Sequence, residues 1–241
     1  MAANDRFQMT FTQVGFRRGV FSLMPLSIFI IPFGVAFGVA AVEFGLTPDQ
    51  AIVMSVLMFS GAAQFAALDL WGVPLPWLSL VLVVLAVNAR HIILGAAMGP
   101  YVNTLRGKHW FGALVWLSDA NFADCYQAIK DGERDAGQLL GGGFILWAVW
   151  AVATAFGVFA GSILGNLDRF GVDVVMAAFF AALTVNTVGS FRAAIPVAAA
   201  CIVAAVTMPI LPTGWNVIAA AIVGGLVGAF GPSDAKGSPA S

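Results

Sequence analysis

The length of its apolar segments constrains this chain more than any other feature. Between Gly19 and Ala89 the sequence contains no lysine and no arginine, and stretches such as Trp77 to Val87 are almost entirely apolar. An α-helix of about 20 apolar residues crosses the hydrocarbon core of a bilayer, whereas a membrane β-strand alternates in polarity over roughly 10 residues. The sequence therefore predicts an all-α integral membrane protein.

Composition supports a polytopic bundle with many crossings. Of the 241 residues, 60% are hydrophobic and 10% are charged, against about 25% charged residues in a soluble domain. At roughly 20 residues per helix plus short loops, the chain holds about seven or eight spans. We expect them at residues 20–43, 50–70, 76–99, 110–129, 139–164, 172–190, 193–209 and 214–230. Seven spans is an alternative because the last two segments are short.

Three regions are expected along the chain: a cytoplasmic N-terminal segment at 1–19, a single transmembrane transporter domain at 20–230, and a disordered tail at 231–241. The first segment is either an interfacial helix or disordered. With eight spans, one side of the membrane carries Arg6, Arg17, Arg18, Lys130, Arg134, Arg192 and Lys236, and the other carries Arg106, Lys108 and Arg169. Because cytoplasmic loops are enriched in Lys and Arg, we expect a multi-pass protein of the cytoplasmic membrane with both termini cytoplasmic.

Several function classes find no support in the sequence. The net charge is −1 and no basic stripe is present, so nucleic acid is not an expected partner. Cys125 and Cys201 lie far apart in apolar segments without metal-ligand spacing, so no metal is expected. No nucleophile–base motif and no phosphate-binding loop appears. We therefore expect neither a cofactor nor an enzyme.

The two halves of the chain are weakly similar. Phe33–Gly38 resembles Ala155–Gly161, and Ser60–Phe65 resembles Asn186–Phe191. Duplicated halves with glycine-interrupted helices are typical of transporters that bind substrate between the repeats. Small residues are common in all membrane helices, however, and chance similarity is the alternative.

Arg90 is a cation within an otherwise apolar segment. Such a residue costs about 2.5–3.5 kcal/mol at mid-helix on insertion scales, unless it snorkels, is hydrated or is paired. Asp119, in the expected span 110–129, is a better partner for Arg90 than Asp124 or Asp69. Asp119 is also a candidate proton carrier, because burial favours a neutral carboxyl group and a nearby cation favours a charged one. The alternative is a static pair that fastens two helices. His91, on another helix face, is expected to be structural rather than a proton relay.

Two interruptions suggest where a solute binds. Pro25 and Pro32 should disturb the backbone hydrogen bonds of the first span, and the small residues from Ser60 to Gln64 permit close packing or unwinding of the second. Unwound backbone presents N–H and C=O groups that suit the carboxylate and ammonium of an amino acid. The candidate substrate-binding residues are Phe33, Gly34, Gly61, Ala62, Gln64, Asn88 and Arg90, with Pro32, Asn121, Asn186 and Thr187 as secondary candidates.

The segments Pro32–Gly34 with Phe37-Gly38, Ser60–Phe65 and Asn88–His91 together resemble the AzlC-type (azaleucine-resistance) family of branched-chain amino-acid permeases, over residues 15–230. The resemblance implies the large subunit of a secondary transporter. It would export leucine, isoleucine and valine, with methionine as a further candidate, in a proton-coupled manner. It would work with a small AzlD-type four-helix membrane subunit.

One position departs from this family's pattern. Many members have Thr-Asp-Glu where this chain has Ser118-Asp119-Ala120. The missing glutamate puts in doubt any coupling scheme with two adjacent carboxylates. A non-transporting accessory or scaffold subunit and a small-solute channel are the competing interpretations.

Overall fold

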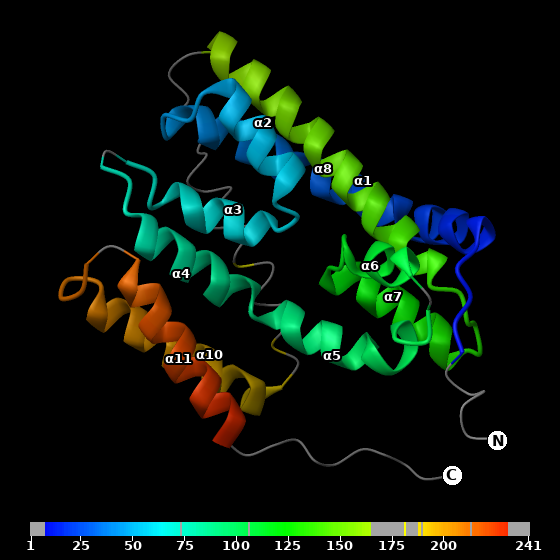
Figure 1. Ribbon diagram of the computed structural model, residues 1–241. Helices are drawn as coiled ribbons and strands as arrows, with labels where there is room; N and C mark the ends of the chain where they lie inside the picture. The colour runs from blue at the N-terminus through cyan, green and yellow to red at the C-terminus, as the bar shows by residue number, and fades with distance from the viewer. Residues whose placement is uncertain are drawn as a thin grey trace.

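The computed structural model describes residues 8–72, 74–105, 107–164, 181, 188, 190–212 and 214–230. The described residues form the helices α1 (Gln13–Glu43), α2 (Pro48–Leu57), α3 (Gly61–Leu68), α4 (Trp77–Asn88), α5 (Arg90–Val102), α6 (Lys108–Leu114), α7 (Asp119–Lys130), α8 (Gly137–Leu164), α10 (Phe191–Thr207) and α11 (Trp215–Phe230) (Figure 1). Their arrangement supports the predicted all-α class. The expected span at 172–190 falls almost wholly outside the described residues.

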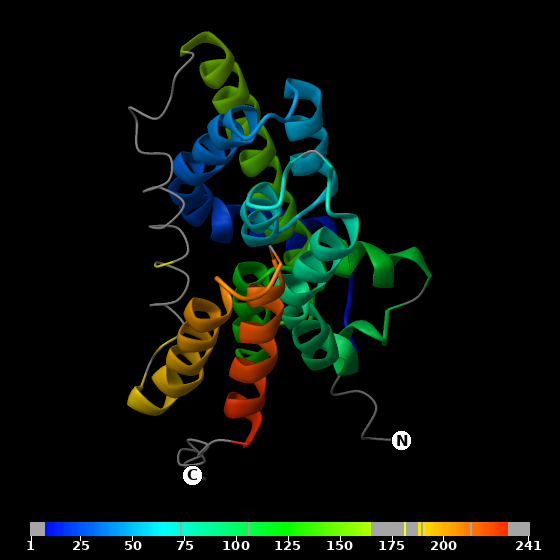
Figure 2. The same cartoon turned by 90° about the vertical axis from the view of Figure 1, so that its left-hand side faces the viewer.

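Helices α1 and α8 lie side by side and run in the same direction (Figures 1 and 2). Early in both helices, a Cβ atom on Gly19 would lie 2.1 Å from the Gln138 carbonyl oxygen. Late in both, a Cβ atom on Gly38 would lie 2.2 Å from the Thr154 carbonyl oxygen. Glycine is needed at such positions because the two backbones almost touch. Helices α2, α3, α6 and α7 pack against this pair.

The expected interruption of the first span is not present. Pro25 and Pro32 both lie inside α1, which continues from Gln13 to Glu43. Each proline removes one backbone N–H donor, yet the long contact with α8 keeps the helix continuous. The prediction that this span is broken near Pro32 was therefore wrong.

The expected span 50–70 is a hairpin rather than one helix. Helix α2 ends at Leu57, and α3 begins at Gly61 and turns back, so that the Gln64 side chain bonds to the Met54 carbonyl oxygen at 3.2 Å. Phe65 then packs on Phe37 of α1, with ring centroids 5.5 Å apart. The hairpin thus enters and leaves from the end of the molecule where α1 finishes, and its tip lies halfway along α8.

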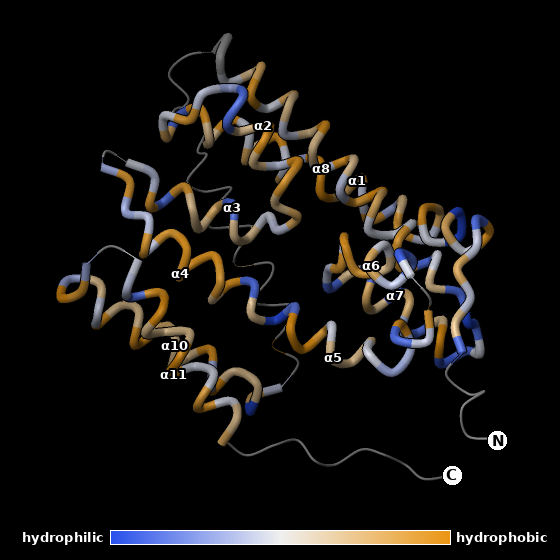
Figure 3. The backbone as a smooth tube through the Cα atoms, viewed as in Figure 1, coloured by the Kyte–Doolittle hydropathy of each residue, from blue (hydrophilic) through white to orange (hydrophobic). Residues whose placement is uncertain are grey.

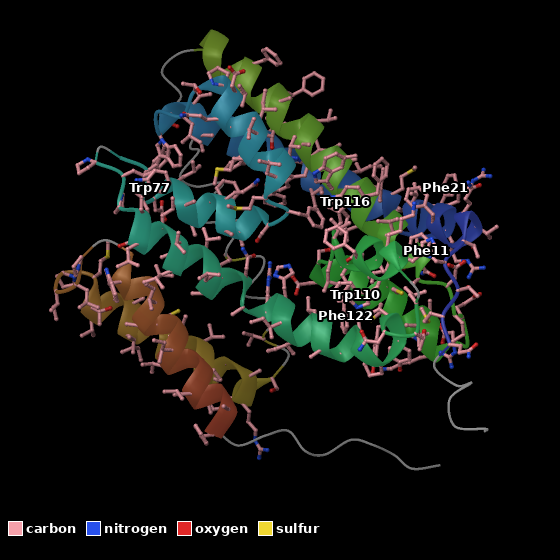
Figure 4. All side chains as sticks on the ribbon, in the orientation of Figure 1. Phe11, Phe21, Trp77, Trp110, Trp116 and Phe122 are labelled. Carbon is pink, nitrogen blue, oxygen red and sulfur yellow. The ribbon has the colours of Figure 1, made fainter. Side chains whose placement is uncertain are left out.

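The expected span 110–129 forms a second hairpin from the opposite end. Near the start of α6, His109 stacks on Phe11 with ring centroids 4.9 Å apart. At the tip, Trp116 stacks on Trp147 of α8 at 5.0 Å, and Figure 4 shows Trp116 beside that helix. Helix α7 then runs back from the tip to the end of the molecule at which α6 begins. At both tips the non-helical backbone is held against α8, through Trp150 at the first tip and Trp147 at the second.

Helices α4 and α5 connect the two ends of the molecule and bend by 41° between Asn88 and Arg90. Trp77 starts α4 at one end, far from Phe11 and Phe21 at the other (Figure 4). In Figure 3 the tube is largely apolar along these helices, except for a hydrophilic stretch at the bend.

Two described helices, α1 and residues Gly137–Gly161 of α8, are long and apolar enough to cross a bilayer. The bent α4–α5 pair adds a third, and α10 and α11 are apolar but shorter. Figure 2 shows α10 and α11 beside each other, and α11 also contacts α4. The described residues therefore do not confirm the expected seven or eight spans.

Candidate functional site

A cavity of about 180 Å³ lies where the two hairpin tips meet the bend between α4 and α5. One part of its wall is apolar and comes from α1, the first hairpin and α8: Leu26, Ile30, Phe59, Leu146 and Trp150. The rest comes from helix starts: Ser60, Gly61 and Ala62 of α3, Arg90 and His91 of α5, and Ser118 and Ala120 of α7. Two helix N-termini and the bend between α4 and α5 therefore meet at one small cavity.

The tip of the first hairpin is held by a buried amide. Gln64 is fully buried, and its Nε2 donates to the Met58 carbonyl oxygen at 3.0 Å and lies 3.3 Å from Ser55 Oγ. Its Oε1 accepts a 2.8 Å hydrogen bond from Trp150 Nε1. Ser55 in turn bonds to Thr154 of α8 at 2.9 Å. Gln64 therefore satisfies the interrupted backbone and fastens it to α8, and it does not line the cavity.

Asn121 does the same for the second tip. Its Nδ2 donates to the carbonyl oxygens of Trp116 and Leu139 at 2.8 and 2.9 Å. Its Oδ1 accepts from the Ser118 backbone N–H at 2.7 Å, and the Ser118 side chain caps α7 in return. This reciprocal cap is the physical reason that α7 begins at Asp119.

Arg90 and Asp119 form an ion pair between the bend and the second tip. Arg90 Nη1 lies 2.8 Å from Asp119 Oδ2. Asp119 occupies the first turn of α7, where the helix dipole favours a negative charge. The contact expected from the sequence is present, although Asp119 lies at a helix start rather than within a continuous span.

Three buried side-chain atoms around this region have no hydrogen-bond partner among the described residues: Ser60 Oγ, Asn88 Oδ1 and Arg90 Nε. Ser60 and Arg90 line the cavity itself. Buried polar atoms are nearly always bonded, so atoms left without a protein partner beside a cavity indicate a place for a polar ligand or for water.

A second cavity, of about 620 Å³, adjoins the first. It is lined by the ends of α2 and α4 and by the second tip, including Met58, Asn88 and Trp116. Phe59, Ser60 and His91 line both cavities. The His91 ring is near its own turn, with Nδ1 3.1 Å from the Asn88 carbonyl oxygen.

The structure divides the residues predicted from the sequence into four groups. Gly61, Ala62 and Arg90 line the smaller cavity, and Asn88 lines the larger one. Gln64 and Asn121 hold the tips, while Gly34 packs on Ala153 of α8 and Phe33 packs against an apolar cluster. Pro32 is exposed on α1. Asn186 and Thr187 lie outside the described residues.

Sequence reasoning missed Ser60, Phe59 and Trp150 as cavity residues. A signal existed for the serines, since Ser60 and Ser118 both precede a helix start and serine is a preferred N-cap residue. Trp150 carried no signal within its apolar segment, because its neighbour Gly61 is distant in sequence. A Cβ atom on Gly61 would lie 2.7 Å from the Trp150 ring.

Comparison with known protein families covers the region that builds this site. A family model described as AzlC protein matches residues 25–164, which run from within α1 to the end of α8. The chain belongs to the AzlC family. The matched residues include both hairpins and every side chain that lines the two cavities.

Several relatives of this AzlC-family chain are membrane proteins by name. An uncharacterized membrane protein of Archaeoglobus fulgidus is 33% identical over 165 residues, which are 68% of this chain and 69% of the relative. The Bacillus subtilis branched-chain amino acid transport protein AzlC is 32% identical over 152 residues, 61% of this chain and 58% of the relative. The Escherichia coli inner membrane protein YgaZ is 26% identical over 152 residues, 61% of each chain.

The match therefore spans less than two thirds of the length of the Bacillus and Escherichia relatives. No solved structure matches this chain. Within the described residues no group of three or more His, Cys, Asp or Glu side chains is placed to hold a metal ion.

Proposed function

We propose that this AzlC-family protein is a secondary transporter that exports branched-chain amino acids across the cytoplasmic membrane, with the cavity between the hairpin tips as its substrate site. One observation carries the proposal. The cavity combines unpaired polar atoms at interrupted helices with an apolar wall, which is the arrangement that transporter sites near the bilayer midplane use.

The two kinds of wall fit an aliphatic amino acid. Ser60 and Arg90 offer hydrogen bonds and charge to the zwitterionic end, while Leu26, Ile30 and Leu146 offer apolar contact to the side chain. Small-molecule sites are generally apolar with a few placed polar groups that fix orientation. The printed name of the Bacillus relative supports the same substrate class.

Asp119 is our candidate for the proton-responsive group. Its carboxylate is held by Arg90, and its side chain is half-exposed. Protonation would remove the attraction between the two residues, and this changes the contact between the bend and the second tip. A group of this kind lets a proton gradient act on the cavity.

Export and a partner complete the proposal. The likeness to AzlC-type permeases supports outward transport and assembly with a small AzlD-type four-helix subunit. The apolar outer faces of α10 and α11 are available to lipid or to such a subunit, with Ile202 and Ile222 among the exposed side chains.

The test is counterflow in proteoliposomes that contain this protein and the small subunit. Vesicles loaded with leucine, isoleucine or valine should accumulate the labelled amino acid, and Asp119→Asn should lose the acceleration by a pH gradient. Asp131→Asn, which alters an exposed carboxylate outside the site, is the matched control and should keep it. Failure of all three amino acids to exchange would refute the substrate class.

The same assay separates the competing interpretations. A scaffold subunit predicts that Arg90→Leu combined with Asp119→Leu keeps full activity, because the pair would only fasten helices. A channel predicts current without saturation and without preference for the L-enantiomer. Saturable, stereoselective exchange that this double variant abolishes supports the transporter.

A further inference from the structure

The two adjoining cavities differ in which helix ends they meet. The smaller one is lined by the first residues of α3, α5 and α7. The larger one is lined by the last residues of α2, from Val56, and by Asn88, the last residue of α4. Helix N-termini carry partial positive charge and C-termini partial negative charge. Because α4 and α5 meet at Ala89 in helical backbone, their dipoles nearly cancel there. The positive side is therefore set by α3, α7 and the charge of Arg90, and the negative side by the end of α2, with Ser60 and His91 at the junction between them.

The unpaired atoms have the matching chemistry. On the positive side, Ser60 Oγ and Arg90 Nε are hydrogen-bond donors that expose less than 1 Å² each and have no partner in the described part of the chain. On the negative side, Asn88 Oδ1 is an equally buried acceptor that finds no partner there either. Donors stand where the dipoles favour an anion, and an acceptor stands where they favour a cation.

We infer that the site binds an α-amino acid zwitterion in one orientation, with its carboxylate on Ser60 and Arg90 and its ammonium toward Asn88. This inference rests on the proposed function and adds the direction in which the substrate lies. Arg90 can hold Asp119 through Nη1 and the carboxylate through Nε at the same time, because the guanidinium has five N–H donors in a fixed fork. The aliphatic side chain then lies along Trp150 and Leu146.

Binding in this orientation does not require Ser60 to give up a hydrogen bond to its own helix. Ser60 has no side-chain bond to its own helix, although it occupies the N-cap position of α3. A capping serine normally accepts from the helix backbone. Its hydroxyl therefore has no bond within α3 that a ligand would have to break.

Three ligands that differ at one end each test the orientation. Leucine has both charged ends, 4-methylpentanoate lacks the ammonium, and leucinamide lacks the carboxylate. Binding of each is measured by ligand-dependent thermal stabilisation of the purified full chain with its small subunit. We expect Ser60→Ala to weaken leucine and 4-methylpentanoate by about tenfold, the value of a hydrogen bond to a charged group, and to leave leucinamide unchanged.

Asn88→Leu should give the opposite pattern, with leucine and leucinamide weakened about tenfold and 4-methylpentanoate unchanged. Ser79→Ala, a buried serine of α4 that lines neither cavity, controls for serine removal and should bind all three as the parent does. A variant that fails to fold is replaced by Ser60→Gly or Asn88→Ala, which also remove the serine hydroxyl and the side-chain amide.

Equal weakening of all three ligands by both variants, or the reverse pattern, would overturn the orientation while leucine transport stands. A parent protein that binds 4-methylpentanoate in a Ser60-dependent way but not leucine would support the carboxylate end and refute the proposed substrate class. A parent that binds none of the three would refute both.

Discussion

Replacing Gln64 by leucine separates a structural role from a substrate-binding one. In the structure the Gln64 amide makes two hydrogen bonds that leucine cannot replace, one with the Trp150 Nε1–H at 2.8 Å and one with the Met58 carbonyl oxygen at 3.0 Å. The Met54 carbonyl oxygen also accepts from the Met58 backbone N–H, so it keeps a partner in the variant. In Gln64→Leu, the Trp150 N–H and the Met58 carbonyl oxygen therefore both lose their hydrogen bond to Gln64.

Each loss costs about 1–3 kcal/mol, which gives on the order of 3 kcal/mol for Gln64→Leu. For a chain of this size the melting temperature should fall by roughly 6–12 °C. The assay is thermal unfolding of the purified protein in detergent, followed by tryptophan fluorescence. Gln127→Leu, which removes an exposed amide bonded to Asp131, is the matched control and should change stability by less than about 0.5 kcal/mol.

A double variant makes the test sharper. Trp150→Phe removes the N–H donor that needs Gln64, so the two substitutions together should cost less than the sum of their separate costs, by about 1–2 kcal/mol. If Gln64→Leu keeps the parent melting temperature and loses leucine binding instead, Gln64 is a substrate ligand and the structural interpretation is refuted.

Three further perturbations test the architecture. Gly141→Ala places a Cβ atom 1.9 Å from the Phe16 carbonyl oxygen and should destabilise the α1–α8 pair by about 1–3 kcal/mol, whereas Gly225→Ala meets open space and should be neutral or stabilising in the same melting assay. Asn121→Leu should lower the melting temperature about as much as Gln64→Leu, since the Trp116 and Leu139 carbonyl oxygens lose their shared donor; an unchanged melt would contradict its role at the tip. Arg18→Ala breaks a half-exposed pair with Glu133 and should cost less than about 1 kcal/mol, an effect that added salt reduces; a larger, salt-insensitive loss would be inconsistent with a surface pair.

Continuous apolar helices were the part of the fold that the sequence predicted best. The expected spans 139–164, 193–209 and 214–230 agree closely with α8, α10 and α11. These segments carry their signal locally, because a continuous apolar run predicts a helix without reference to distant residues. The start of α1 at Gln13 was missed because its first turns carry Arg17 and Arg18.

The hairpins were not predictable from apolar length. Residues 50–70 and 110–129 are each long enough to cross a bilayer. The polar side chains of α7, such as Asp119, Asn121 and Asp124, are a sign against an uninterrupted apolar span. Hydropathy does not show, however, that either segment consists of two half-helices that turn back. What decides is a set of distant contacts, such as Gln64 with Trp150 and Asn121 with the Leu139 carbonyl oxygen. The cap signals at Ser60 and Ser118 mark where the interruptions fall, but not the direction of the chain after them.

The charge pair was predictable because few residues competed for it. Arg90 stands in a long segment with no other basic residue, and Asp119 was the best-placed acid in a neighbouring segment. Electrostatic cost in lipid made the pairing a strong expectation. Ser60, by contrast, was identified as a site residue from its buried, unpaired hydroxyl. Whether a hydroxyl has a hydrogen-bond partner depends on the folded structure and cannot be read from the sequence.

The most direct test of the central claim is an experimental structure of the complex with its small subunit in the presence of leucine. The account predicts ordered ligand density between Ser60, Arg90 and Trp150, with the carboxylate toward Arg90. Leucine density in the separate cavity lined by Asp69 and Asn216, with the cavity between the hairpin tips left without it, would contradict the account.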